Sequence, residues 1–306
     1  MGPVTPLPAQ DQRDPRPQRQ NGGVDLVRLL DLASHGPDTF VGSGPQYHWG
    51  GLYGGQIVAQ TARAAANTID GLGGEDGFAI NSLRAYFIRP GDASQPIQFD
   101  VERLRTGRGF ATRRVLARQA DGAILNLEAS FQRPQTGPDI DSAHMPAVPG
   151  PDDVETDNWT PMFERKPLRQ AQMPGDGRHG AHREMYWMRS NASLGDDQVN
   201  HCCAAAYMSD DLPCDAAARA HPGAGGNLPT DHPEWFQEFK KGWFSASLDH
   251  AMWFHRPMQA DQWQLYDCSC VTYAGGRGLT VGHIYALDGT HVCTFTQEVI
   301  IRAVRA

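Results

Sequence analysis

The sequence repeats itself at a spacing of 167 to 169 residues. Three short motifs recur in the same order: YFIRP at 86–90 and WFHRP at 253–257, GRGF at 107–110 and GRGL at 276–279, and Asp-Gly at 121–122 and 288–289. Matches in order at a nearly constant spacing favour duplication of one domain. Because 306 residues suit about two domains, we predict two related halves.

Composition changes along the chain mark the limits of these halves. Residues 1–23 are rich in Pro, Gln, Arg and Asp and have little to bury, which predicts a disordered tail. Apolar residues over 24–32 follow a helical period and predict a short amphipathic helix. Residues 134–182 are rich in proline and predict a linker. The predicted domains are therefore 24–133 and 183–306.

Each half has the same predicted order of elements. A strand (39–41, then 183–191) precedes a helix (54–69, then 197–209), and several long strands follow. The first helix has Arg63 as its only charge and is apolar nearly all round, which indicates burial against a surrounding sheet. The fold class is α+β.

Charge and hydropathy exclude several classes of protein. The net charge of −8 disfavours nucleic acid as a partner. Mean hydropathy is −0.49 and long apolar runs are absent, so we expect no membrane span. The N-terminus lacks the apolar core of a secretion signal, and we expect a cytoplasmic protein. The six cysteines are interpreted as buried free thiols, and the scattered histidines predict no metal.

Five segments identify a family. They are GGQIVAQ at 54–60, YFIRPGD at 86–92, VERLRTGRGFATRRV at 101–115, LDHAMWFHRP at 248–257 and VCTFTQE at 292–298. In this order they resemble the acyl-CoA thioesterase II (TesB-type) family, over roughly residues 24–303. The resemblance implies a tandem double hotdog, with two antiparallel sheets each wrapped around a long helix. It also implies hydrolysis of fatty acyl-CoA to free acid and CoA without a cofactor, by a homodimer or tetramer.

The resemblance also implies three catalytic residues, which hold and activate the attacking water. Asp210 is the acid of the segment YMSD, Ser247 is the hydroxyl before LDH, and Gln297 is the amide of TQE.

The residues themselves support Asp210 as a base. It continues an apolar helical stripe through Val199, Cys203 and Ala206, so its side chain points where burial is costly. Burial and the nearby helix C-terminus both raise the pKa of a carboxyl group, which suits a general base near neutral pH. The alternative is that Asp210 or Asp211 lies in a turn or caps the next helix.

The other two polar residues lie in strands. Gln297 is in phase with Cys293 and Phe295, so its amide needs partners on an apolar face. The alternative is a core glutamine bonded to backbone. Ser247 shares its phase with Ser245 and is the weakest of the three assignments by itself.

The repeat predicts a single active site per chain. At a spacing of 167, Ser247 aligns with Ile80, and Gln297 aligns with Ser130, or with Ala129 if the register shifts by one. The first-half helix holds no acid over 54–69. The catalytic copy is therefore the second half.

Gly54, Gly55 and Gln56 open the first-half helix. A helix N-terminus offers unpaired N–H groups, so the Gly55 or Gln56 amide is our candidate to polarise the substrate carbonyl. The alternative is that both glycines serve only close packing of the helix on the sheet.

Two tempting assignments are set aside. Arg89 and Arg256, repeated in Phe-x-Arg-Pro, suit structural ion pairs better than CoA phosphate contacts. Ser247, Asp249 and His250 do not form a triad, because neighbours on a strand face opposite sides.

Other readings remain open. The segment 214–244, between Asp210 and Ser247, is a long insertion that could cover or reshape the acyl pocket. The competing functions are an acyl-thioester-binding protein and a hydratase-type hotdog enzyme, although an Asp-x-Asn-Pro-x-His signature is absent.

Overall fold

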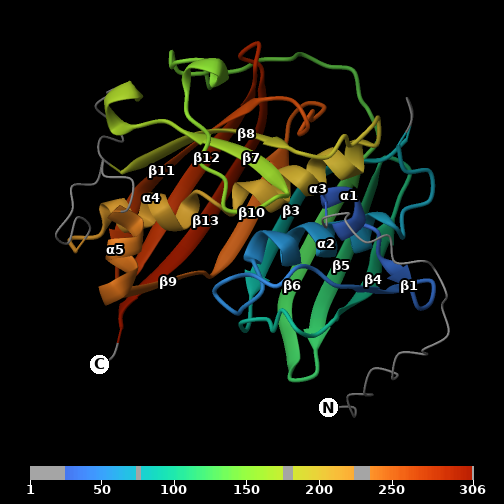
Figure 1. Cartoon of the computed structure of the whole chain (residues 1–306). Helices are drawn as coiled ribbons and strands as arrows, with labels where there is room; N and C mark the ends of the chain where they lie inside the picture. The colour runs from blue at the N-terminus through green and yellow to red at the C-terminus, as the bar shows by residue number, and fades with distance from the viewer. Residues whose placement is uncertain (1–24, 74–76, 175–181, 224–234, 305–306) are drawn as a thin grey trace.

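The structure is a computed structural model that describes residues 25–73, 77–174, 182–223 and 235–304; the predicted tail lies outside the described residues. Its strands form one 13-stranded antiparallel sheet (Figure 1). The strand order is β1-β2-β4-β5-β6-β3-β10-β13-β12-β11-β8-β7, and β9 also pairs with β13. In this part of the chain we find no helix long and apolar enough to cross a membrane.

The first half supplies one end of the sheet and a buried helix. Its elements are α1 (Leu26–Leu29), β1 (Ala33–Ser34), β2 (Thr39–Gly42), α2 (Gly54–Ala66), β3 (Ala79–Phe87), β4 (Ile97–Thr106), β5 (Phe110–Gln119) and β6 (Gly122–Gln132). The predicted helix over 24–32 is confined to the four residues of α1, which Asp25 caps by accepting from the Arg28 N–H. The side chains of α2 are buried nearly all round, as predicted.

The second half supplies the other end of the sheet and more helices. Its elements are β7 (Phe163–Pro167), β8 (Arg183–Ser190), α3 (Gln198–Ser209), α4 (Pro213–Ala220), α5 (Trp235–Gly242), β9 (Trp243–Ser247), β10 (Asp249–Phe254), β11 (Gln264–Ala274), β12 (Arg277–Ala286) and β13 (His291–Ala303). Two short 3-10 turns, Pro151–Asp153 and Gln170–Gln172, precede β8. Helices α4 and α5 lie in the long insertion between Asp210 and Ser247, of which 224–234 lies outside the described residues.

The two halves meet where β3 pairs with β10, so the two predicted sheets join into one continuous sheet. Asp249 pairs with Tyr86, and Trp253 pairs with Ser82. Trp253 lies 167 residues after Tyr86, and Asp249 lies 167 residues after Ser82. The seam is therefore symmetric at the spacing found in the sequence. Its physical basis is that an unpaired strand edge exposes backbone N–H and C=O groups, and each half covers the edge of the other.

The repeated turns follow the same symmetry, and the register at Gln297 follows it with a shift of one residue. Gly122 and Gly289 both have positive φ in the predicted hairpins. Ala251 pairs with Thr296, whereas its counterpart Arg84 pairs with Glu128, which shifts the correspondence by one residue. Ala129 is therefore the first-half counterpart of Gln297, the second of the two alignments considered.

The proline-rich segment 134–182 does more than connect the halves. It contributes β7, which pairs with β8 at the edge of the sheet. Val154 and Leu168 from this segment pack with Trp187 and Leu265 in a small apolar cluster. This cluster covers a face of the second half that would otherwise expose large apolar side chains.

Helices α2 and α3 lie side by side in front of the middle of the sheet (Figure 1). They run antiparallel: a Cβ placed on Gly55, at the start of α2, would lie 2.2 Å from the Tyr207 carbonyl near the end of α3. At the other end, Arg63 of α2 donates to Asp197, the N-cap of α3, at 3.0 Å. This packing brings the start of α2 to the end of α3, where Asp210 lies.

Candidate active site

The three predicted catalytic residues meet in one hydrogen-bonded group. Asp210 is the C-cap of α3 and is 7% exposed. Ser247, at the end of β9, donates from Oγ to Asp210 Oδ1 at 3.0 Å. Gln297, fully buried in β13, donates from Nε2 to Ser247 Oγ at 2.7 Å. An acid, a hydroxyl and an amide from three elements of the second half therefore converge.

Burial sets the protonation of Asp210. Removal from water, together with the charge of the neighbouring Asp211, raises the pKa of its carboxyl group to about 6. Hydrogen bonds from Gln297, Ser247 and the Gly55 N–H act in the opposite direction. The result is a carboxylate that is ionised at neutral pH and still basic enough to accept a proton from water.

The glycines of the first half lie directly against this group. A Cβ on Gly54 would lie 2.6 Å from Asp210 Oδ2, and one on Gly55 would meet the Tyr207 carbonyl. Only residues without a side chain permit this approach. The N-terminus of α2 therefore reaches the carboxylate of the other half, and the Gly55 N–H bonds to it.

The Gln56 side chain does not join the site. It is fully buried and accepts from the Tyr47 hydroxyl at 2.7 Å, while its Nε2 donates to Gln60 at 3.2 Å. The Tyr47 hydroxyl is also 3.1 Å from that of Tyr207. The Gln56 side chain thus belongs to a buried polar network behind the site.

Asp211 has a separate role from its neighbour. Its Oδ2 accepts from Arg165 Nη1 at 2.9 Å, and its Oδ1 accepts from Trp159 Nε1 at 2.8 Å. Both donors come from the proline-rich segment, so Asp211 anchors that segment to the end of α3. The N-cap of α4 is Leu212, and neither Asp210 nor Asp211 caps this helix.

Aromatic side chains gather beside Asp210. The cluster joins both halves and the proline-rich segment, and consists of Tyr47, Trp49, Tyr53, Trp159, Phe163 and Tyr207. Tyr53, next to Gly54 in the chain, donates to the Tyr207 carbonyl at 2.9 Å. Sequence reasoning missed this cluster, because its members are far apart in the chain and share no period.

The structure confirms that Asp249 and His250 face opposite sides of β10. Asp249 accepts from the Glu298 N–H at 2.7 Å, whereas His250 is fully buried with its Nδ1 2.5 Å from Gln297 Oε1. His250 contacts the glutamine rather than Ser247, so a serine–histidine–aspartate triad is not assembled. Sequence reasoning discarded this triad correctly but missed His250 as the partner of Gln297.

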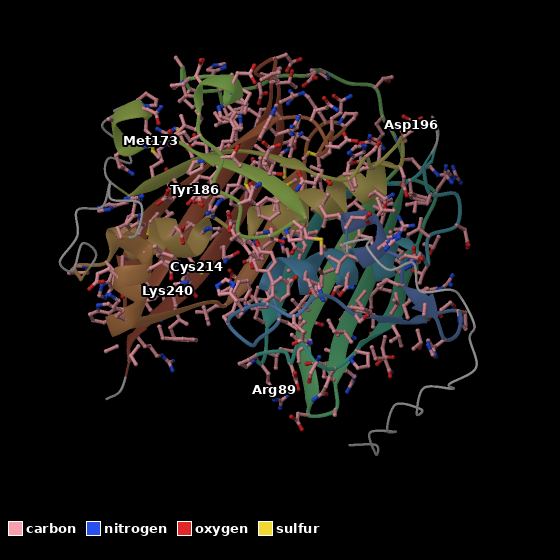
Figure 2. All side chains as sticks on the ribbon, viewed as in Figure 1. Arg89, Met173, Tyr186, Asp196, Cys214 and Lys240 are labelled. Atoms are coloured by element: carbon pink, nitrogen blue, oxygen red, sulfur yellow. The ribbon has the colours of Figure 1, made fainter. Side chains whose placement is uncertain are left out.

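The repeated arginines make structural contacts. Arg89 donates to the Ala123 carbonyl at 2.9 Å, and Figure 2 labels it near the bottom of the first-half sheet. Arg256 pairs with Asp139 and Asp141 of the proline-rich segment. These contacts support the ion-pair interpretation for Arg256 and a backbone contact for Arg89.

The cysteines are free thiols, and all but Cys214 are buried. Cys214 projects from α4 (Figure 2), and burial raises the pKa of its thiol. A protonated thiol is a poor nucleophile. Among the described residues, no group of three or more His, Cys, Asp or Glu side chains is arranged to hold a metal ion.

Comparison with known proteins identifies the family of the chain. The family profile for the acyl-CoA thioesterase N-terminal domain matches residues 44–132, and that for the C-terminal domain matches residues 140–301. Human acyl-coenzyme A thioesterase 8 is 33% identical, over 91% of this chain and 89% of its own length.

Solved structures extend the comparison to the fold. An acyl-CoA thioesterase II from Mycobacterium marinum superposes with a TM-score of 0.74 at 32% identity, covering 92% of this chain and 98% of its own. A hotdog-fold protein from Alicyclobacillus acidocaldarius superposes with a TM-score of 0.69 at 18% identity, covering 92% and 98%, and shows the fold alone.

The fold and these relatives define the class of protein as a hotdog-fold thioester hydrolase. The chain belongs to the acyl-CoA thioesterase II (TesB-type) family.

Proposed function

We propose that Asp210, Ser247 and Gln297 activate a water molecule that hydrolyses fatty acyl-CoA. The observation that carries this proposal is the continuous hydrogen bonding from Gln297 through Ser247 to Asp210. The second N–H of Gln297 Nε2 bonds to Asp210 in this structure and donates to the water oxygen once a water binds between the two side chains. Asp210 then accepts a proton from the same water, and a remaining lone pair attacks the thioester carbon.

The N-terminal turn of α2 stabilises the oxyanion that this attack produces. Gly54 and Gln56 contribute backbone N–H groups and the helix adds the positive end of its dipole, while the Gly55 N–H stays bonded to Asp210. The tetrahedral intermediate collapses by breaking the C–S bond, and Asp210 returns its proton to the departing CoA thiolate. The close approach of Gly54 and Gly55 to Asp210 supports this role.

The finer domain organisation follows the same proposal. We propose a tandem double hotdog with units 24–133 and 183–306, joined by 134–182, and one active site per chain. The symmetric seam and the apolar counterparts Ile80 and Ala129 support a first half that keeps the fold without the catalytic groups. The assembly into homodimers or tetramers and the cytoplasmic location stay predictions from the sequence.

A thiol-release assay tests the reaction against its alternatives. The wild type is mixed with acyl-CoAs of short to long chains, and free CoA is followed with a thiol reagent. A hydrolase releases CoA and free acid in equal amounts. An acyl-thioester-binding protein retains intact substrate, and a hydratase changes the acyl chain without releasing thiol, so either result contradicts the proposed reaction.

The pKa of Asp210 predicts the pH profile of hydrolysis. The base must be ionised, and folding raises its pKa to about 6. Activity therefore falls as pH decreases through about 6 and is independent of Asp210 ionisation well above it. The measurement is kcat/KM against pH; a lower limb centred near pH 4, as for an exposed aspartate, would contradict the assignment.

Removal of the Ser247 hydroxyl is expected to shift that profile. Its hydrogen bond lowers the pKa of Asp210, so Ser247→Ala moves the acid limb to higher pH and lowers kcat about tenfold or more. The matched control is Ser245→Ala, two residues earlier on the same face of β9, which retains activity. The reverse result for the two serines would assign the hydroxyl to Ser245.

A further inference from the structure

Behind the three proposed catalytic residues, His250 and Ser209 form a buried pair. His250 Nδ1 is 2.5 Å from Gln297 Oε1, and His250 Nε2 is 2.9 Å from the hydroxyl of Ser209. The side chains of His250, Gln297 and Ser209 are all fully buried. Ser209 precedes Asp210 in the chain, so hydrogen bonds run from the end of α3 through β10 and β13 and back to Asp210.

The direction of these bonds depends on how the Gln297 amide is turned. With Nε2 toward Ser247, the amide donates to the serine and toward Asp210, where the proposed water binds, while Oε1 needs a donor on its other side. Turned the other way, Oε1 would face Ser247 and no N–H would remain for the water. Only the first orientation supports the proposed water activation.

His250 selects that orientation if its proton is on Nδ1. The Nδ1–H then donates to Gln297 Oε1, and the unprotonated Nε2, at 2.9 Å, accepts from the Ser209 hydroxyl in preference to the Ala206 carbonyl at 3.2 Å. Burial lowers the pKa of His250 to about 4, so the ring stays neutral through the working range. A neutral ring with one donor and one acceptor is what a directed chain of hydrogen bonds requires.

We propose that His250, held by Ser209, is a positioning residue that fixes the Gln297 amide with its nitrogen toward Ser247 and the attacking water. This inference rests on the proposed function of Asp210, Ser247 and Gln297. His250 acts through Gln297 and does not itself reach the substrate.

The surroundings of both titrating groups determine what a pH profile reports. His250 stacks near the Phe295 ring and lies beside Met252, which shares the Ser209 hydroxyl. Asp210 faces Tyr53 from the start of α2 and Cys214 from α4, in addition to Asp211. The hydroxyl and thiol groups stay protonated near pH 6, because burial raises the pKa values of Tyr53 and Cys214.

Two substitutions at His250 separate positioning from packing. His250→Leu keeps an apolar volume but has no donor for Gln297 Oε1, whereas His250→Asn offers an amide N–H near the position of Nδ1. We expect kcat of His250→Leu to fall about 10- to 100-fold with KM changed less than about threefold. His250→Asn restores most of this loss.

The acid limb of the pH profile gives an independent readout. Gln297 is the strongest of the hydrogen bonds that lower the pKa of Asp210. With the amide no longer held, that pKa increases, so the acid limb of His250→Leu moves to higher pH while that of His250→Asn stays near the wild type. A purely structural defect lowers the amount of active protein without moving the limb.

The controls distinguish failure of this inference from failure of the proposed function. His201→Leu removes another buried histidine, which bonds backbone groups at Gly195 and Ala260, and it should leave the acid limb unchanged. Gln297→Ala and Asp210→Asn must both lose activity; if they retain it, the proposed function fails. If they lose it while folded His250→Leu keeps wild-type kcat and acid limb, or His250→Asn is as impaired as His250→Leu, the positioning role is overturned.

Discussion

Asp210→Asn is expected to lower kcat for acyl-CoA hydrolysis about a thousandfold. Asparagine has nearly the same shape and can still occupy the C-cap of α3, but it cannot accept a proton from water. KM should change little, because Asp210 acts on the water rather than on the acyl-CoA. Steady-state thiol release across the chain-length panel measures the effect.

Asp211→Asn is the matched control for this substitution. Asp211 binds Arg165 and Trp159 of the proline-rich segment, so its loss affects stability before catalysis. Circular dichroism and a thermal melt establish that each variant folds. Near wild-type turnover by a folded Asp210→Asn would remove the aspartate from the mechanism and leave the water without its base.

Gly55→Ala is expected to destabilise the protein by about 1–3 kcal/mol and to impair hydrolysis at least tenfold. Its new Cβ would lie 2.2 Å from the Tyr207 carbonyl and 2.6 Å from the Tyr53 ring. Since a backbone carbonyl cannot move aside cheaply, α2 must retreat from α3. The Gly55 N–H then leaves Asp210, and the pKa of the carboxyl group rises.

Gly51→Ala controls for the loss of a glycine near the site. A Cβ there meets its nearest atoms at 3.7 Å, an ordinary contact. Chemical denaturation and kcat are measured for both variants. If Gly55→Ala were as stable and active as Gly51→Ala, the start of α2 would have no close functional contact with Asp210.

Much of the fold could be read from local pattern. The buried α2, the repeated hairpins and the alternating strands depend on short-range periodicity and on glycines with positive φ, such as Gly122. The helix over 24–32 was predicted too long because an apolar period does not set where a helix ends. The strand β7 was not predicted in the proline-rich segment, because only its pairing with β8 makes it a strand.

The candidate site was predicted one residue at a time. The family resemblance gave Asp210, Ser247 and Gln297, and the pattern supported Asp210 and Gln297, which lie in phase with apolar neighbours. Ser247 shares its phase with Ser245 and had no such support. Their partners were not apparent: His250 behind Gln297, and Arg165 and Trp159 on Asp211, come from other elements. Hydrogen bonds between distant segments leave no periodic signal in the chain.

The sequence by itself predicts two related halves, a buried helix in the first, and three polar residues that only the second half carries. The tertiary structure alone decided that the halves share one sheet and that α2 and α3 pack antiparallel, which brings Gly55 to Asp210. The physical reason is the distance along the chain over which each kind of interaction acts. Periodicity and turns act over a few residues, whereas the β3–β10 seam and the α2–α3 contact depend on surfaces that exist only after each half has folded.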